Sequence, residues 1–265
     1  MRKLLILAVI FTFGTISLYA QGELDAQQKI FFRNEKSFAI LLNSDGIGLS
    51  YRGAKRIDYR NKRLFEIDAG TLKLVKEYKQ ASQYVQGSSY IFGKLNSTIF
   101  LRSGIGHQHE LFTKADQGGI AVRYFYSAGP VFAIYKPIYY RVLHLVSANA
   151  YEVIEKKFDS SIASGQDIYS KAAFTKGLDE TKVMPGLYAK AGFNFEYSKE
   201  DKIIHAIEFG GQVNAFPQKI PIMAGSDNKA LFFSLFVSYR FGIVLDPLDP
   251  ESNKLSNIFR RKKNN

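Results

Sequence analysis

Hydrophobic and polar side chains alternate along residues 231–241, near the C-terminal end of the chain. In an extended strand, one face would carry Leu231, Phe233, Leu235, Val237, Tyr239 and Phe241. The other face would carry Phe232, Ser234, Phe236, Ser238, Arg240 and Gly242. A period of two predicts a β-strand. A continuous apolar face opposite a mixed face is typical of a strand with lipid on one side and a crowded interior on the other.

Similar alternation recurs along the chain between short turn signals such as Ser44-Asp45. These segments predict ten strands, at residues 37–43, 46–52, 62–74, 83–92, 97–106, 119–127, 131–141, 187–197, 203–214 and 229–241. We therefore expect an all-β fold, a closed antiparallel up-and-down transmembrane β-barrel of about ten strands. The merging or loss of one hairpin would give eight strands, which is the alternative.

Connection lengths predict the two ends of this barrel, because such barrels have short periplasmic turns and longer external loops. The short connections at residues 93–96, 128–130 and 198–202 would then be periplasmic. The longer ones at residues 75–82, 107–118, 142–186 and 215–228 would lie outside. Within the last of these, residues 215–224 are apolar and include two prolines. We expect this stretch either to cover the lumen as a lid or to dock a partner.

The inward positions of the predicted strands carry charged side chains, whereas the outward positions are apolar. The inward set is Glu66, Asp68, Arg102, Arg123, Lys190, Glu196, Glu208 and Arg240, four acids and four bases. A charge facing lipid costs about 2–4 kcal/mol at the bilayer midplane, so this segregation supports a membrane wall. Because a narrow barrel is just wide enough for side chains, we expect these charges to pair and fill the lumen. The alternative is that they line a polar channel or bind a solute.

The first 20 residues have the layout of a secretory signal peptide. Arg2 and Lys3 precede an apolar run over residues 4–13, and Ala20 is a small residue at the expected cleavage position. The organisation we expect is a signal peptide at residues 1–20, an N-terminal periplasmic segment at 21–34, a barrel at 35–242 and a basic periplasmic tail at 243–265. The chain contains no cysteine, which excludes a lipid-anchored cysteine and any disulfide.

The chain is basic, with a formal net charge of +12. Its basic residues gather in residues 52–56, 60–63 and 260–263. For an exported protein, outer-membrane lipid or an anionic envelope polymer is the accessible partner, and we expect no nucleic acid partner. Turn and solubility charges without a specific partner are the alternative interpretation of the same runs.

One short segment combines residue types used in catalysis, His107, His109 and Glu110. At the outer end of a strand, a histidine could act as a general base that the carboxylate orients. The same side chains could contribute to a metal site, but a catalytic zinc site needs about three suitably placed protein ligands. We therefore expect neither a metal nor a cofactor, and solvated loop residues are the alternative interpretation. The chain has no nucleophile elbow and no phosphate-binding glycine loop.

Three features together resemble an outer-membrane β-barrel protein of the type found in Bacteroidota. They are the signal peptide ending at Ala20-Gln21, the strands with alternating Tyr and Phe, and the terminal segment 238–242 with the sequence Ser-Tyr-Arg-Phe-Gly. The resemblance covers residues 35–242 and implies the outer membrane of a Gram-negative cell. It is architectural and carries over no catalytic residue.

The function expected from these observations is that of a noncatalytic structural or accessory component of a cell-envelope complex. Another envelope protein would contact its outer loops or its basic tail. One alternative is an outer-membrane enzyme that acts on lipid or peptide at the extracellular rim through His107, His109 and Glu110. A second alternative is a narrow solute channel.

Overall fold

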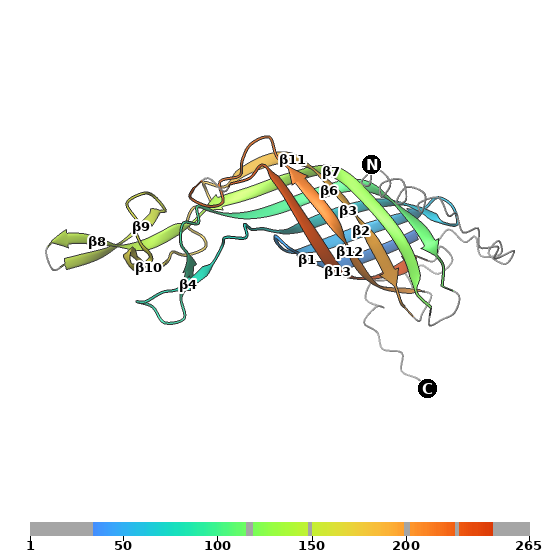
Figure 1. Ribbon diagram of the computed structural model, residues 1–265, viewed down its shortest axis with the longest axis horizontal. Helices are drawn as coiled ribbons and strands as arrows, with labels where there is room; N and C mark the ends of the chain where they lie inside the picture. Colours follow the sequence, from blue (N-terminus) through green and yellow to red (C-terminus); the bar gives the residue numbers. More distant parts are fainter. Residues whose placement is uncertain (1–33, 115–118, 148–149, 199–201, 226–227, 246–265) are drawn as a thin grey trace, which may run out of the picture. The chain divides into compact units, whose positions relative to one another are not determined.

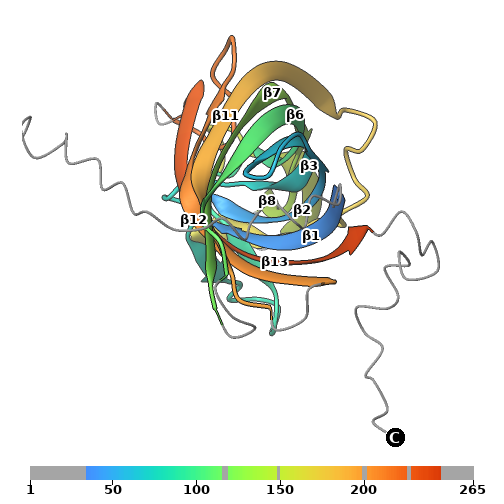
Figure 2. The same cartoon turned by 90° about the vertical axis from the view of Figure 1, so that its right-hand side faces the viewer.

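The computed structural model describes residues 34–114, 119–147, 150–198, 202–225 and 228–245. Within these ranges, antiparallel strands enclose a common interior as a barrel (Figures 1 and 2). The barrel strands are β1 (Asn34–Asn43), β2 (Gly46–Arg56), β3 (Asn61–Leu72), β6 (Asn96–Phe112), β7 (Ala121–Pro137), β11 (Lys182–Glu196), β12 (Ile203–Ala215) and β13 (Leu231–Leu245). Each pairs with the next along the chain, and β13 pairs back with β1. The predicted all-β, closed up-and-down barrel is confirmed.

The barrel has eight strands, so the prediction of ten is wrong and the alternative of eight is correct. Residues 83–92 form no barrel strand, because Lys79–Ala81 (β4) and Ser89–Ile91 (β5) pair only with each other. The predicted strands at residues 119–127 and 131–141 merge, since β7 continues through Ala128-Gly129-Pro130 without a turn.

A glycine followed by a proline ordinarily signals a turn, but here the two residues allow a close contact between strands. The pairing of β6 with β7 joins Arg102 to Val131 and Ile105 to Ala128, and Pro130 lies between these pairs. Proline has no N–H to donate to a ladder, so this gap suits it. A Cβ on Gly129 would lie 2.2 Å from the backbone oxygen of Ser103. Only glycine fits at that position.

The strand connections define two ends of the barrel. The terminal end, where β1 begins and β13 ends, has connections at residues 57–60, 113–120 and 197–202. The opposite end, called the loop end, has connections at residues 44–45, 73–95, 138–181 and 216–230.

The predicted sides of two connections, residues 93–96 and 107–118, are interchanged. Without the strand at residues 83–92, β6 runs in the direction opposite to the predicted one. The merger that forms β7 then restores the predicted direction for the rest of the chain. The predicted signal peptide and basic tail lie outside the described residues, apart from residues 243–245, which belong to β13.

Exposed and buried side chains alternate along the barrel strands, and most of the exposed ones are apolar. Leu49 is 66% exposed, Leu187 69% and Phe233 70%, values that a soluble monomer does not repeat around a whole surface. Other members of this apolar belt are Phe38, Ile40, Leu42, Ile47, Phe65, Ile67, Ile99, Leu101, Ile105, Phe132, Phe193, Ile207, Phe209, Leu231, Leu235 and Val237. Exposed charged residues on these strands lie at the margins of the belt, at Lys36, Lys55 and Arg63 toward the terminal end and Lys182 at the loop end.

The connections at the loop end form a lobe of small sheets, here called the loop-end lobe. Besides β4 and β5, it contains Tyr139–Ser147 (β8) between Ala150–Lys157 (β9) and Ile168–Lys171 (β10), with a short 3₁₀ helix, Gly165–Asp167 (η2). Its buried core is Tyr90, Ile138, Tyr140, Val142, Ile162 and Ile168. No helix in the described ranges is long and apolar enough to cross a membrane.

Candidate functional site

The middle of the barrel interior holds a group of charged side chains that we call the charged layer. It consists of Arg52, Glu66, Asp68, Arg102, Lys190, Glu208 and Arg240, each at most 2% exposed. These are four bases and three acids, contributed by six different strands. Burying a charge is unfavourable by several kcal/mol unless it is paired and hydrogen-bonded, so the contacts of each group decide whether the layer is stable.

Glu208, on β12, is the most heavily contacted carboxylate of the layer. Arg52 approaches it from β2, with 2.5 Å between Nη1 and Oε1. Arg240 approaches from β13, with 2.9 Å from Nε to Oε1 and 3.0 Å from Nη2 to Oε2. Ser238 Oγ and Asn194 Nδ2 donate two further hydrogen bonds, at 3.1 and 2.8 Å. Two guanidinium groups therefore share one carboxylate.

Arg52 joins Glu208 to a second carboxylate. Its guanidinium lies 2.6 Å from Oε1 of Glu66 on β3, and its Cζ lies 4.3 Å from the centre of the Phe125 ring. Ser127 Oγ donates to the other oxygen of Glu66 at 2.6 Å. Arg52 thus bridges opposite parts of the wall through charge-assisted hydrogen bonds, which are stronger than neutral ones.

Asp68 forms the remaining part of the layer toward the loop end. Arg102 Nε lies 3.0 Å and Lys190 Nζ 3.3 Å from its Oδ2. Arg102 also donates to two amide oxygens, to Gln212 at 2.6 Å and to Asn214 at 3.4 Å. These neutral acceptors satisfy guanidinium N–H groups for which no further carboxylate is present in the layer.

A second group of buried and half-buried charges, the terminal cluster, lies nearer the terminal end. Arg123 is its centre, 3.0 Å from Glu110 and 2.5 Å from Glu196. Lys114 also contacts Glu196, at 2.7 Å, and Lys62 forms an ion pair with Glu35. This cluster has three bases and three acids, so each charge has an opposite partner.

The structure brings six of the eight predicted lumen residues together in the charged layer. These are Glu66, Asp68, Arg102, Lys190, Glu208 and Arg240. The other two, Arg123 and Glu196, pair with each other in the terminal cluster. Sequence reasoning missed Arg52, Lys62 and Glu35, because the first two stand in basic runs interpreted as turn charges and the third stands at the start of β1. Alternation could have found Arg52, because a strand that turns Leu49 and Tyr51 outward turns Arg52 inward.

The predicted catalytic segment does not form an acid–base group. His107 and His109 point outward from β6, where their rings lie 5.8 Å from Tyr126 and 5.3 Å from Tyr124. Glu110 points inward to Arg123, because successive residues of a strand face opposite sides. The segment also lies at the terminal end and not at the loop end. Among the residues that the structure describes, no three His, Asp or Glu side chains gather as a possible metal site.

The apolar segment 215–224 folds over the loop end of the barrel interior as a lid. Phe216, Ile220 and Ile222 are buried, and they pack with residues of the strands in one apolar core. We call this core the apolar mouth; its other buried members are Leu72, Phe100, Val131, Ala133, Met184, Tyr188 and Phe232. Asn228 fixes the lid by accepting hydrogen bonds from the backbone N–H groups of Ile222 and Met223, at 2.9 and 3.0 Å.

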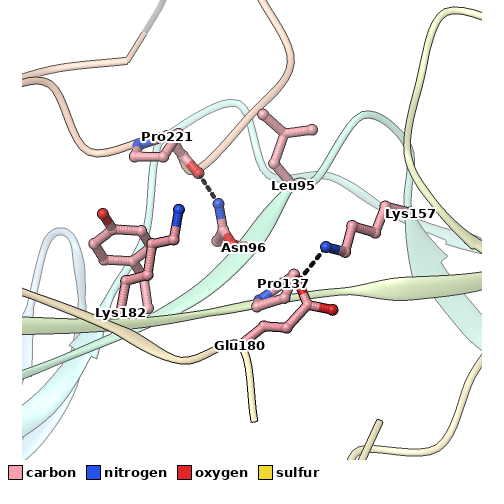
Figure 3. Close-up of a pocket in the computed structure, with 8 residues that line it drawn as sticks. Leu95, Asn96, Pro137, Lys157, Glu180, Lys182 and Pro221 are labelled. Atoms are coloured by element: carbon pink, nitrogen blue, oxygen red, sulfur yellow. Dashed lines mark hydrogen bonds and ion pairs between the residues drawn. The ribbon is translucent and has the colours of Figure 1, made fainter. Parts of the chain in front are cut away.

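Two open grooves lie among the loop-end connections. One, of about 270 Å³, is lined by Asn96, Lys157 and Glu180, and Figure 3 shows the ion pair between Lys157 and Glu180 beside it. The hydrogen bond from Lys157 lowers the pKa of the Glu180 carboxyl. The other groove, of about 650 Å³, is mainly apolar and includes Phe92 and Met223. The first groove thus has charged groups along its wall, whereas the second is mainly apolar.

No protein-family model matches this chain, and no curated protein matches it in sequence. Among solved structures, Neisserial surface protein A is 10% identical, with 81% of this chain and 97% of that chain covered and a TM-score of 0.37. Ail of Yersinia pestis is 7% identical, with 80% and 97% covered and a TM-score of 0.35. The N-terminal β-barrel domain of Pseudomonas aeruginosa OprF is 8% identical, with 80% and 97% covered and a TM-score of 0.31.

Proposed function

We propose that this protein is an outer-membrane β-barrel with a closed lumen, and that it serves as a noncatalytic structural or accessory component of a cell-envelope complex. The observation that carries the proposal is the combination of an exposed apolar belt with a buried, ion-paired interior. This arrangement is inside out relative to a soluble domain, and it suits a wall with lipid outside. Strands of 10 to 17 residues are long enough to cross a bilayer, since about 9–11 tilted residues suffice.

The direction of insertion follows from the connections. Barrels of this architecture have short periplasmic turns and longer external loops. The longest connections here, residues 138–181 and 73–95, are both at the loop end. The terminal end is therefore assigned to the periplasm and the loop-end lobe to the outside. The cleaved signal peptide at residues 1–20, the basic periplasmic tail and the Bacteroidota type of barrel stay predictions within this proposal.

Two layers support a closed lumen. The charged layer occupies the middle of the interior, and its side chains are at most 2% exposed. The apolar mouth then covers the loop end with Ile220 and Ile222, both of which are fully buried. An ion crossing the barrel would have to break several buried ion pairs and displace the lid, which favours a plug over a channel.

The loop-end lobe presents a contact surface for another envelope protein. In the β8–β9 pairing, Leu143 lies opposite Val153 and Leu145 opposite Tyr151, so these four side chains share one face. Leu145 is 54% exposed and Tyr151 68% exposed. Exposed apolar groups on an edge hairpin are typical of protein contact sites.

Three measurements test the proposal in turn. A folded membrane barrel should run at a different gel mobility before and after heating, whereas a soluble sandwich should not. The folded protein should give no conductance in planar lipid bilayers, and steady channel currents would overturn the closed lumen. A partner captured from native outer membranes should be lost with Tyr151→Ser/Val153→Ser and retained with the control Glu152→Ser on the same strand.

A further inference from the structure

Two basic side chains face each other on the outer surface near the terminal end. Lys55 on β2 and Arg63 on β3 are directly opposite in the strand pairing, and both are exposed. Like charges opposite each other on one face of a sheet are destabilising. Among the residues that the structure describes, no carboxylate lies within ion-pair distance of either base. The chain thus maintains an unfavourable pair at the margin of the apolar belt.

The wall is hollowed beside this pair. The next outward pair toward the loop end is Gly53 with Phe65, and Ile105 on β6 lies opposite Phe65. A Cβ added to Gly53 would meet no atom within 4 Å. The result is a groove of about 360 Å³, apolar along Gly53, Phe65 and Ile105 and polar at Asn34, Lys55 and Arg63.

The rest of this margin differs in chemistry. Toward the terminal end, the outward positions of β7, β12 and β13 include Tyr124, Tyr126, His205 and Tyr239, which are aromatic or imidazole groups. His205 is engaged by the Tyr239 hydroxyl, with 2.8 Å between Nδ1 and Oη. Aromatic girdles of this kind are common at membrane interfaces. On the described strands, the exposed Lys and Arg side chains of the terminal end lie on β1, β2 and β3 alone.

We propose that this groove binds one anionic phospholipid. The headgroup phosphate is held between Lys55 and Arg63, which relieves their repulsion, and the first part of an acyl chain lies over Gly53 against Phe65 and Ile105. The assignment rests on the proposed membrane insertion, because that insertion places the groove at the level where headgroup meets acyl chain. Each Lys or Arg near an anionic membrane surface favours association by about fivefold.

The test is native mass spectrometry of the full-length protein with phosphatidylglycerol or phosphatidylethanolamine of matched acyl chains. We expect the wild-type protein to retain phosphatidylglycerol in preference to phosphatidylethanolamine. Lys55→Gln/Arg63→Gln should lower phosphatidylglycerol binding roughly 25-fold, the product of two fivefold effects, and abolish the preference. Lys73→Gln, just beyond the other end of β3, is the matched control and should leave both the phosphatidylglycerol binding and the preference unchanged. Inorganic phosphate in excess should not displace the lipid, because it cannot occupy the apolar part.

A second pair of variants tests the apolar part without altering charge. Gly53→Leu fills the groove and should lower lipid retention. The control Gly211→Leu places the same side chain on an outward position of β12, where an added Cβ would be in ordinary van der Waals contact with Phe233 and Leu235. Equal binding of both lipids by wild type, or an unchanged preference in the double variant, would overturn the site. Displacement of the lipid by inorganic phosphate would also overturn the lipid site, because it would show that the groove binds the free anion. Heat-modifiable mobility is recorded for every variant, so a lost lipid site is distinguished from a chain that is not a membrane barrel.

Discussion

The charged layer and the apolar mouth fill neighbouring parts of one barrel interior by opposite means. In the charged layer, side chains from strands far apart in sequence meet through ion pairs, as Arg52 does with Glu208. In the apolar mouth, a connection between two strands supplies Phe216, Ile220 and Ile222, which pack without polar partners. The first region depends on every partner being present, whereas the second depends on shape and volume.

The difference has an energetic meaning. A buried ion pair gains little over apolar packing, but removing one member leaves an uncompensated charge. An apolar contact loses only the transfer energy of the removed atoms and the cavity left behind. The charged layer should therefore respond to single substitutions sharply, and the apolar mouth in proportion to the volume removed.

Glu208→Ala should produce the largest effect, because it leaves Arg52 and Arg240 without their shared carboxylate. We expect the free energy of unfolding to fall by about 3–5 kcal/mol, measured by denaturant titration of protein folded into lipid vesicles. Glu152→Ala, at an exposed position of β9, is the control and should change little. A loss below about 1 kcal/mol in Glu208→Ala would show that water, and not the protein, solvates these charges.

Ile220→Ala should destabilise the fold by about 2–4 kcal/mol, since this side chain is fully buried in the apolar mouth. Ile220→Val removes one methylene and should lower the stability by about 1 kcal/mol. The graded response is the signature of packing. Both variants should stay silent in planar bilayers because the charged layer remains intact, and conductance in Ile220→Ala would identify the lid as the seal.

Asn228→Ala should have a smaller effect, about 1–2 kcal/mol, because it leaves the N–H groups of Ile222 and Met223 without an acceptor. Asn228→Asp keeps the acceptor oxygen and loses the side-chain amide that donates to the Met223 oxygen. The stability of this variant should therefore lie between those of the wild type and Asn228→Ala. Hydrogen exchange of the backbone N–H groups of Ile222 and Met223 measures the effect directly. Unchanged protection in Asn228→Ala would mean that apolar packing alone holds the lid.

Tyr140→Phe removes one hydrogen bond from the buried core of the loop-end lobe and leaves the apolar ring in place. Its effect on stability should be the smallest of the four. The Tyr140 hydroxyl lies 2.7 Å from the Ile91 oxygen, and removing this hydrogen bond should cost about 1 kcal/mol. Burial raises the pKa of Tyr140 above its ordinary value of 10.0.

The sign of the pH dependence follows from this raised pKa. The stabilising contribution of neutral Tyr140 is complete below about pH 10 and decreases as the pH rises through the higher folded value. The stability difference between wild type and Tyr140→Phe should therefore be constant from pH 7 to 9 and shrink in more alkaline solution. A difference that grows above pH 10 would contradict this assignment.

Much of the barrel wall could be predicted from the sequence, since a period of two needs only neighbouring residues. Alternation places Phe233 and Leu235 on the outward face, and both are exposed. The strand count could not be predicted in the same way. Residues 83–92 have strand-forming composition, yet Tyr90 is buried in the core of the loop-end lobe. Whether a strand joins the barrel depends on its pairing partners, which local composition does not specify.

The candidate sites show the same division. Alternation determined that Glu66, Asp68 and Glu208 point inward, and it also separates Glu110 from His107 and His109 on opposite faces of β6. Only the tertiary structure decided that Arg52 meets Glu208, 156 residues away, and that segment 215–224 folds over the interior as a lid. The physical reason is that alternation depends only on residues close together in the sequence, whereas these contacts join residues far apart in it. Periodicity fixes the face on which a side chain lies, whereas closure of the barrel fixes the height and the partner that it meets.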